Sequence, residues 1–390
     1  MPLTALLIYA SLLVSSLVAN AFVPLAPVFA DELGLSATET GVALAASTIP
    51  LLMAAGLLGV LSDRTSARTL TIHSSVLLTS MAAAQAFAFD FWSLVVARLL
   101  FGVGLALVWT AGLAWLAQLS AASRRPRALS WTIAVAGAGV AAGPVYAGVL
   151  ANRASLEAPF LIGAAGCAVI GVGLALSRAG EVTSEAGPLV RETLRSIWAT
   201  PLLLGGIVAI SLGGVATSSA NLLVPYQLTQ NGHSIETVGL LLSISSALFA
   251  VACAWVAHQG VRVASLRSAG VAAAILALAF IPVIASTSTE AVTGFLFLRV
   301  PAWALLSTIP YALCAIGAMR ASLGYGAVIG VLTQFWAVTA ALGPIAAGAI
   351  VESGGTQWAY AVLALSCAAS ALWLVSPRPI RGLPHTVEEA

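Results

Sequence analysis

The sequence contains no lysine, because all 16 of its basic residues are arginine. A phosphate-binding P-loop needs the lysine of G-x-x-x-x-G-K-[ST], so the chain does not hydrolyse ATP through such a loop. Any driving force must come from a gradient or from another subunit. Charged residues are also scarce, at 8%, and hydrophobic residues make up 60%. Soluble domains carry about 25% charged residues, so an ordinary water-facing surface is excluded.

Metal-binding and nucleic-acid-binding patterns are absent as well. The four cysteines lie in apolar stretches without the spacing of a metal site, and the net charge is only +2. No basic tract with interleaved aromatic residues is present. We therefore expect no metal, no cofactor and no nucleic-acid partner.

Charges and turn residues divide the chain into apolar pieces of the length that crosses a bilayer, about 20 residues as helix. The first piece lacks the basic n-region of a signal peptide and is expected to be a span. The sequence predicts membrane-spanning helices near 4–29, 40–61, 70–89, 91–118, 128–151, 158–177, 201–226, 238–257, 268–286, 291–314, 325–350 and 356–375.

The arginines predict the orientation of these spans. If the N-terminus lies inside, thirteen arginines fall in cytoplasmic loops or the tail and only Arg153 on the opposite side. An excess of arginine marks cytoplasmic loops. We expect a monomer in the cell (plasma) membrane, surrounded by lipid, with both termini cytoplasmic.

An internal repeat joins the two halves of the sequence. Asn20-Ala-Phe-Val-Pro24 recurs as Asn221-Leu-Leu-Val-Pro225, and Arg98 recurs as Arg299. Gly143-Pro144 with Gly148 recurs as Gly343-Pro344 with Gly348. The predicted fold is an all-α membrane protein with twelve transmembrane helices in two pseudo-symmetric six-helix bundles. Its expected parts are an N-terminal bundle at 1–177, a cytoplasmic linker at 178–200, a C-terminal bundle at 201–375 and a cytoplasmic tail at 376–390. Such repeats are typical of secondary transporters, whose substrate site lies between them.

The loop between the second and third spans reads Gly59-Val-Leu-Ser-Asp63-Arg64-Thr-Ser-Ala-Arg68. It resembles the G-x-L-x-D-R-x-G-R-[RK] signature of the major facilitator superfamily, with Ser66 and Ala67 departing from it. The resemblance implies the major facilitator fold. It also implies that Gly59, Asp63, Arg64 and Arg68 form a latch that holds the outward-facing state.

Two further segments carry the resemblance. Arg98-Leu-Leu-Phe-Gly102-Val-Gly104 is similar to the family's R-x-x-x-G-x-G element. Gly139, Gly143 and Pro144 match its span-five G-x-x-x-G-P-x-x-G signature, and Gly148 lies one position beyond the last glycine of that signature. The resemblance implies the drug/proton antiporter (exporter) branch. From the residues alone, this motif and its repeat at Gly343 and Pro344 predict close helix packing.

Arg98 and Arg299 are expected about 10 Å inside their spans at 1.5 Å per residue. An arginine at such depth faces a partner or a watery cavity, or it reaches back to the outer headgroups. No acidic residue falls in the interior of a predicted span. If these cations do not reach the headgroups, we expect a backbone carbonyl, an amide such as that of Asn20 or Asn221, or an anionic substrate to pair with them. The candidates for a substrate cavity or for coupling are Asn20, Arg98, Trp109, Asn221, Arg299, Trp303, Gln334 and Trp336. Each tryptophan could equally be a packing or interfacial residue.

The leading interpretation is a transporter, not an enzyme, that exports a small amphipathic or drug-like compound by alternating access in exchange for protons. A facilitator or importer of a sugar, a carboxylate or another small metabolite is the alternative within transport. A membrane-embedded lipid-modifying enzyme is the alternative from another class, although no catalytic cluster is visible. A channel is disfavoured by the repeat.

Overall fold

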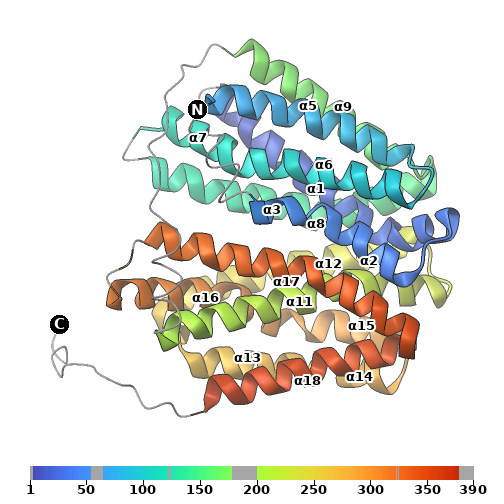
Figure 1. Cartoon of the computed structure of the whole chain (residues 1–390), viewed down its shortest axis with the longest axis vertical. Helices are drawn as coiled ribbons and strands as arrows, with labels where there is room; N and C mark the ends of the chain where they lie inside the picture. Colours follow the sequence, from blue (N-terminus) through green and yellow to red (C-terminus); the bar gives the residue numbers. More distant parts are fainter. Residues whose placement is uncertain are drawn as a thin grey trace.

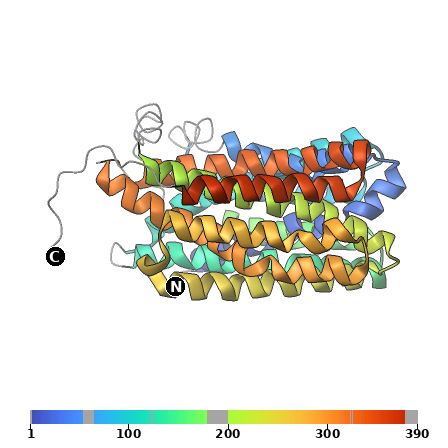
Figure 2. The same ribbon diagram turned by 90° about the horizontal axis from the view of Figure 1, so that it is seen from below.

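The computed structural model describes residues 3–53, 65–121, 124–177, 200–321, 323 and 325–376. Every element in these residues is a helix, and none of them forms a strand. The helices run side by side along one direction, as two views at right angles agree (Figures 1 and 2).

The helices fall into two groups along the chain. The first group is α1 (Leu3–Leu33), α2 (Ala37–Ala46), α3 (Ile49–Met53), α5 (Ala67–Ala86), α6 (Phe91–Leu107), the π-helix η2 (Val108–Gly112), α7 (Leu113–Leu119), α8 (Arg125–Arg153) and α9 (Ala158–Leu176). The second group is α11 (Pro201–Gln230), α12 (Ile235–Gln259), the 3₁₀-helix η3 (Gly260–Val263), α13 (Leu266–Ala279), α14 (Ile281–Ala285), α15 (Thr289–Leu298), α16 (Val300–Arg320), α17 (Tyr325–Gly354) and α18 (Thr356–Val375).

These helices occupy the ranges expected from the sequence, and most ends fall within a few residues. Part of the range 40–61 lies outside the described residues. Among the described residues, ten helices are long and apolar enough to cross a membrane. The ranges 40–61 and 70–89 are not among these ten. For 70–89 the reason is its composition, because α5 carries polar residues such as His73, Thr79 and Gln85 along its length.

We call the end of the molecule at which α1 begins and α18 ends the near end, and the end at which α1 finishes, at Leu33, the far end (Figure 1). Several helix starts at the far end carry side-chain caps. Ser36 accepts from the amide of Glu39, whose carboxylate accepts from the amide of Ser36, and Asp90 and Ser93 form the same reciprocal pair. Such capping boxes satisfy amides that have no partner within the helix.

Several of the long rods are interrupted near the middle. α2 ends at Ala46 and α3 begins at Ile49. α15 ends at Leu298 and α16 begins at Val300, so that Arg299 alone separates them. Pro50 and Pro301 follow these interruptions. Proline has no amide hydrogen and cannot continue the hydrogen-bond ladder of the preceding turn, which explains why the rods break there.

The same helix contacts occur in both groups. α1 packs on α8 as α11 packs on α17, and α5 packs on α9 as α13 packs on α18. The two groups meet where α8 packs on α12 and where α17 packs on α2. In Figure 1 the first group lies above the second, and α8 and α17 run along the boundary.

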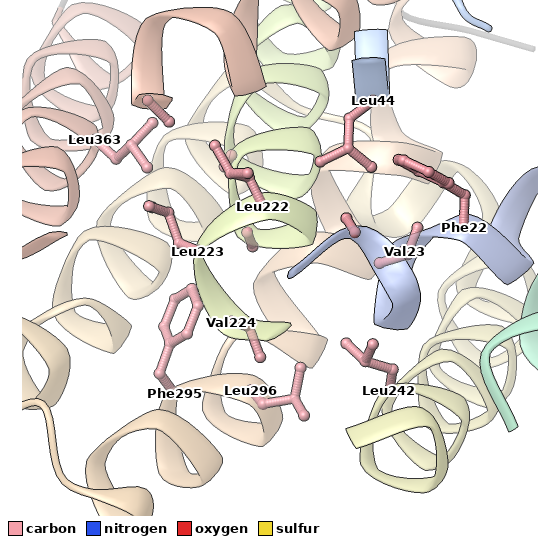
Figure 3. Packing of buried hydrophobic residues seen from close by; sticks show 14 of the residues in the cluster. Phe22, Val23, Leu44, Leu222, Leu223, Val224, Leu242, Phe295, Leu296 and Leu363 are labelled. Atoms are coloured by element: carbon pink, nitrogen blue, oxygen red, sulfur yellow. The ribbon is translucent and has the colours of Figure 1, made fainter. Parts of the chain in front are cut away.

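The largest buried apolar cluster extends across this boundary. Leu12, Val23 and Phe22 of α1 belong to it together with Leu222 of α11 and Leu242 of α12. Figure 3 shows Val23 and Leu44 from the first group and Leu222 and Leu242 from the second in one packed region. The two groups of helices are therefore held together by apolar contact in this state.

Candidate functional site

The first contact between the two groups is a crossing of α8 with the start of α12 at the far end. A side chain added at Gly148 would lie 2.7 Å from the carbonyl oxygen of Ile235, and one added at Gly239 would collide with the carbonyl of Pro144. The amide of Val145 donates to the hydroxyl of Ser243 over 2.9 Å. Pro144 leaves Val145 near a disturbed part of the helix ladder, and Ser243 satisfies that amide.

A second crossing, of α17 with the start of α2, repeats the first. A side chain at Gly348 would collide with the carbonyl of Ala37, and one at Gly41 would collide with the carbonyl of Pro344. The four glycines allow the backbones to touch, as small residues do between membrane helices. The two crossings together close the far end.

Each crossing also carries a carboxylate that bridges the two groups. Glu236, in the first turn of α12, accepts from Asn152 over 2.9 Å and from Arg153 over 3.3 Å at the end of α8. Glu352, in the last turn of α17, accepts from the amide of Thr38 in the first turn of α2 over 2.8 Å. A carboxylate at a helix N-terminus is favoured by the partial positive charge there.

The remaining glycines of the repeated motif pack within their own group. Side chains at Gly139 and Gly143 would collide with the backbone of α1 at Leu13 and Leu17. One at Gly343 would meet Ser218 and the carbonyl of Val215 on α11. The motif therefore binds each long helix to a neighbour in its own group and, one to two turns further on, to the other group.

Arg98 lies inside the first group and is only 2% exposed. Its Nε donates to the carbonyl of Ala43, its Nη1 to the Oε1 of Gln85 over 3.1 Å, and its Nη2 to the hydroxyl of Ser47 over 2.9 Å. The guanidinium carbon lies 3.9 Å from the centre of the Phe22 ring. Because α2 ends at Ala46, the carbonyl of Ala43 is free of its helical partner. Each of the three guanidinium nitrogens therefore has an acceptor within the protein.

Arg299 lies inside the second group and is 4% exposed. It is the single residue between α15 and α16. Its guanidinium carbon lies 4.8 Å from the centre of the Trp303 ring and 5.7 Å from that of Phe295. Its Nε has no hydrogen-bond partner. The related cation thus has aromatic neighbours and lacks the acceptor that Arg98 Nε has.

The other cavity candidates lie on several helices. Asn20 is half-buried on α1 and donates to the carbonyl of Ser16 over 2.9 Å, and Asn221 is half-buried on α11. Trp109 lies in the π-helix η2, a rare element that often marks functional positions. Trp303 is half-buried and stacks on Phe249 with ring centres 3.7 Å apart. On α17, Gln334 is half-buried and Trp336 is 38% exposed.

The predicted loop latch lies mostly outside the described residues, since Gly59, Asp63 and Arg64 are among residues 54–64. Arg68 is described. Its Nη2 donates to the carbonyls of Ala175 over 3.0 Å and Ser177 over 3.1 Å, at the end of α9. A cation at a helix C-terminus satisfies its last carbonyls, so Arg68 ties α5 to α9 at the near end.

One small cavity lies at the far end between the two groups. It measures about 90 Å³ and is lined by residues of α1, α2, α11 and α17 such as Asp31, Thr40 and Tyr226. Ligand pockets measure about 300–1,000 Å³, so this cavity holds a few waters and not a substrate. None of the predicted cavity residues lines it.

Sequence reasoning missed several residues that the structure brings into these contacts. Gly41 and Gly239, Ser243, Gln85 and the two carboxylates Glu236 and Glu352 were not predicted to be site residues. One signal was available, because Gly41 and Gly239 lie 198 residues apart, close to the offset of the repeat.

The comparison with protein families decides the identity. The model of the Major Facilitator Superfamily matches residues 8–327. The chain belongs to this superfamily. It is therefore a membrane transporter. Its long apolar helices and the helix contacts repeated in the two groups are consistent with this. No curated protein matches the sequence.

Solved structures of Major Facilitator transporters share its fold. A bacterial homologue of the human lysosomal transporter Spinster matches in its inward-facing unoccupied form with a TM-score of 0.75, at 14% identity, over 95% of this chain and 94% of that one. Its inward-facing occupied form matches with a TM-score of 0.77 over the same shares, also at 14% identity. A D-xylose–proton symporter matches with a TM-score of 0.71, at 14% identity, over 97% of both chains.

Proposed function

We propose that this Major Facilitator transporter spans the membrane twelve times and exports a small amphipathic or drug-like compound by alternating access, in exchange for protons. In this proposal residues 1–177 and 201–375 act as two bundles, joined by a cytoplasmic linker at 178–200 and followed by a cytoplasmic tail at 376–390. The protein acts as a monomer in the plasma membrane.

The observation that carries the proposal is the pair of glycine crossings at the far end. They are related by the repeat, and they join α8 to α12 and α17 to α2 through direct backbone contact. Rocking of one repeat against the other about a central site is the general behaviour of such transporters. In this proposal the far end is the outer side of the protein, and the two crossings close it by contacts that can separate. We therefore assign this state to an inward-facing form.

Charge supports the orientation. The described acidic residues all lie toward the far end: Asp31, Glu32, Glu39, Asp90, Glu157, Glu236, Glu290 and Glu352. The described arginines of the near end are Arg68, Arg124, Arg125, Arg127, Arg262, Arg267 and Arg320, against Arg153 at the far end. Arginine-rich ends face the cytoplasm, which favours cytoplasmic termini and a far end that faces outward.

The predicted site residues keep distinct roles in this proposal. Gly59, Asp63, Arg64 and Arg68 form the inner latch. The half-buried Asn20, Trp109, Asn221, Gln334 and Trp336 border the central route of the substrate. Arg98 holds α2, α5 and α6 together within the first bundle, and Arg299 and Trp303 belong to the second.

Export is favoured by the segment Gly139 to Gly148 of α8, whose G-x-x-x-G-P core resembles that of proton-coupled exporters. A second candidate is an importer or facilitator. It is favoured by one observation, namely that no acidic residue lies in the interior of a described helix, so the usual intramembrane proton carrier of an exporter is lacking there. The fold shared with a D-xylose–proton symporter is compatible with this second candidate.

The test is proton movement in proteoliposomes. The purified protein is reconstituted with a pH-sensitive dye inside, a pH gradient is imposed, and amphipathic cations, amphipathic carboxylates and sugars are added in turn. An exporter is expected to collapse the gradient faster, when an amphipathic compound is supplied, than protein-free liposomes given the same compound.

The other outcomes each identify an alternative. Uptake of a sugar together with protons would identify an importer, and exchange without proton movement would identify a facilitator. A steady ohmic current would contradict alternating access, and a chemically altered lipid would point to an enzyme.

A further inference from the structure

The break between α15 and α16 is a built feature of the second group. Pro301 occupies the second position of α16 and removes one hydrogen bond from the ladder, whereas the amides of Arg299 and Trp303 still donate to the carbonyls four residues before them. On the neighbouring helix α12, the buried hydroxyl of Ser245 donates to the carbonyl of Leu296 over 3.0 Å. A side chain from another helix therefore satisfies an α15 carbonyl that the break leaves free.

Arg299 occupies this break without a complete set of acceptors. It is 4% exposed, and its Nε lacks a hydrogen-bond partner. A buried charge is costly unless it is paired and hydrogen-bonded. The faces of Trp303 and Phe295 attract the cation, but a ring face does not replace an acceptor in the plane of the guanidinium.

The polar groups nearby are already engaged with one another. The hydroxyl of Tyr360, an electrostatic neighbour of Arg299, donates to the Oε1 of Gln227 over 3.0 Å. The Nε2 of Gln227 donates to the hydroxyl of Thr356 over 3.1 Å. Figure 3 shows Phe295 and Leu296, one turn before Arg299, directed toward the apolar residues Leu223 and Val224 of α11. These surroundings supply no anion to Arg299.

The start of α16 adds to the positive field. α16 has 21 residues, Pro301 has no amide hydrogen, and the amide of Trp303 donates to the carbonyl of Arg299. The amides of Val300 and Ala302 are therefore the ones left at its start. Aligned peptide dipoles place a partial positive charge at this end. A half-helix N-terminus inside a transporter is a recognised place for an anionic group, and here a buried guanidinium with an unpartnered nitrogen lies directly at it.

We propose that the α15–α16 break is an anion-binding site, in which Arg299 and the amides of Val300 and Ala302 hold a carboxylate. Trp303, stacked on Phe249 with ring planes 18° apart, offers an apolar wall beside the charge. The ligand is thus an amphipathic carboxylate with its charged group at Arg299 and its apolar body along these two rings. The assignment of a carboxylate as the transported group rests on the proposed function, whereas the site itself does not.

The test is binding of pyruvate, a small carboxylate that crosses lipid slowly. Thermal unfolding of the purified full-length protein in detergent is followed against sodium pyruvate, at constant ionic strength made up with the bulky sulfonate MOPS. The variants are Arg299→Gln, Arg299→Lys and Arg320→Gln. Arg320 is exposed at the end of the same helix and controls for loss of one positive charge.

The wild type and Arg320→Gln are expected to show a saturable rise in Tm of several degrees. Arg299→Gln is expected to show none. Arg299→Lys is expected to need several-fold more pyruvate, because lysine keeps the charge and loses the planar fork of donors. An equal rise in Arg299→Gln, or no saturable rise in the wild type up to 300 mM pyruvate, would overturn the proposal.

Tryptophan fluorescence gives a second, local readout. Pyruvate bound at Arg299 is expected to change the emission of the wild type, and the change is expected to disappear in Trp303→Phe while the Tm rise remains. An emission change of the same size in Trp303→Phe would place the bound anion elsewhere and contradict the site.

The source of the carboxylate is separated by exchange in proteoliposomes. Exchange of radiolabelled pyruvate that is lost in Arg299→Gln assigns the site to a transported carboxylate. Stabilisation without exchange assigns it to a resident small anion and supports the binding site alone. The Tm measurement needs no transport, so failure of the proposed export function leaves it intact, and failure of binding leaves the proton-movement assay intact.

Discussion

Arg98 and Arg299 occupy related points of the two halves, 201 residues apart, and both are buried. Arg98 donates to Ala43, Ser47 and Gln85 and lies over Phe22. Arg299 has rings beside it and an Nε without a partner. The hydrogen bonding of the guanidinium is therefore complete in the first half and incomplete in the second.

The difference follows from which helix is interrupted. In the first half the interruption falls in the neighbouring rod, between α2 and α3, and it offers the carbonyl of Ala43 and the side chain of Ser47 to Arg98. In the second half α12 runs unbroken from Ile235 to Gln259, and the interruption falls at Arg299 itself. The repeated arginine is thus fully hydrogen-bonded in one half, whereas in the other it has aromatic neighbours and an Nε without an acceptor.

The largest expected effect comes from Arg98→Leu. Removing the guanidinium leaves the buried acceptors of Ala43 and Gln85 without donors, and each unpaired buried group costs about 1–3 kcal/mol. We expect a loss of about 3 kcal/mol or more in the free energy of unfolding. Arg299→Leu removes a cation that has few hydrogen bonds to lose, so without added anion we expect a change of about 1 kcal/mol or less, of either sign. Thermal unfolding of both purified variants measures the two effects. An equal loss of Tm in the two would contradict the claim that Arg98 stabilises the fold more than Arg299 does.

The glycine crossings test whether the two halves are equivalent where they meet. Gly148→Val and Gly348→Val each place a side chain against a carbonyl of the other half. Overpacking of this kind costs about 1–3 kcal/mol. Because the clash occurs only while the two halves touch at the far end, it destabilises that state, and both variants are expected to shift the population toward opening there. Gly137→Val is the control on the same helix as Gly148, because a side chain at Gly137 meets nothing within 4 Å.

The readout is the distance between spin labels at Ala154 and Asn231, in a background with the four cysteines replaced by alanine. Both glycine variants are expected to lengthen it, and Gly137→Val is expected to leave it unchanged. Lengthening by Gly148→Val alone would mean that α17 and α2 do not share the closure.

Much of this arrangement was predictable from the sequence, and the reason is the membrane. Apolar length fixes where helices lie, so the ranges 128–151 and 325–350 agree closely with α8 and α17. The repeat predicted related arginines. It could not predict their partners, because Pro50 indicates a break in the range 40–61 but does not show that the freed carbonyl of Ala43 would meet Arg98.

Contacts between helix ends were also beyond the sequence. Glu236 and Glu352 look like ordinary acids at the ends of spans, and only the packing of α8 on α12 and of α17 on α2 brings them to the other half. The roles of Asn20, Asn221 and Gln334 stay predictions.

A smaller difference is expected between the two bridging carboxylates. Glu236 pairs with Arg153, whose side chain is 71% exposed, and exposed pairs contribute about 0.2–1 kcal/mol and are screened by salt. Glu352 accepts from a backbone amide that carries no full charge. Glu236→Gln is therefore expected to lower Tm slightly at low salt and not at high salt. Glu352→Gln is expected to have an effect that depends less on salt, because only the partial charge of the α2 N-terminus is screened. A double-mutant cycle with Arg153→Gln measures the coupling between Glu236 and Arg153. Zero coupling at low salt would mean that this ion pair does not stabilise the contact between the two halves.

The smallest expected effect concerns the caps of α6 and α15, which start the two helices on which the related arginines lie. Asp90 caps α6 and Ser288 caps α15. The amide of Ser93, followed by its hydroxyl, holds the pKa of the Asp90 carboxyl below its ordinary value of 3.8. Since the folded pKa is the lower one, the carboxylate stabilises the folded state fully above the unfolded pKa, and this contribution is lost as pH falls through the folded value. Asp90→Asn keeps a cap without the charge, so its Tm difference from the wild type should shrink between pH 5 and pH 3. Ser288→Asn changes no charge at its own position, although the Glu290 amide and then the Ser288 side chain hold the pKa of the Glu290 carboxyl down. Its Tm difference should therefore vary less with pH. A pH-independent difference for Asp90→Asn would mean that the cap, and not its charge, sets the start of the arginine-bearing helix in the first half as it does in the second.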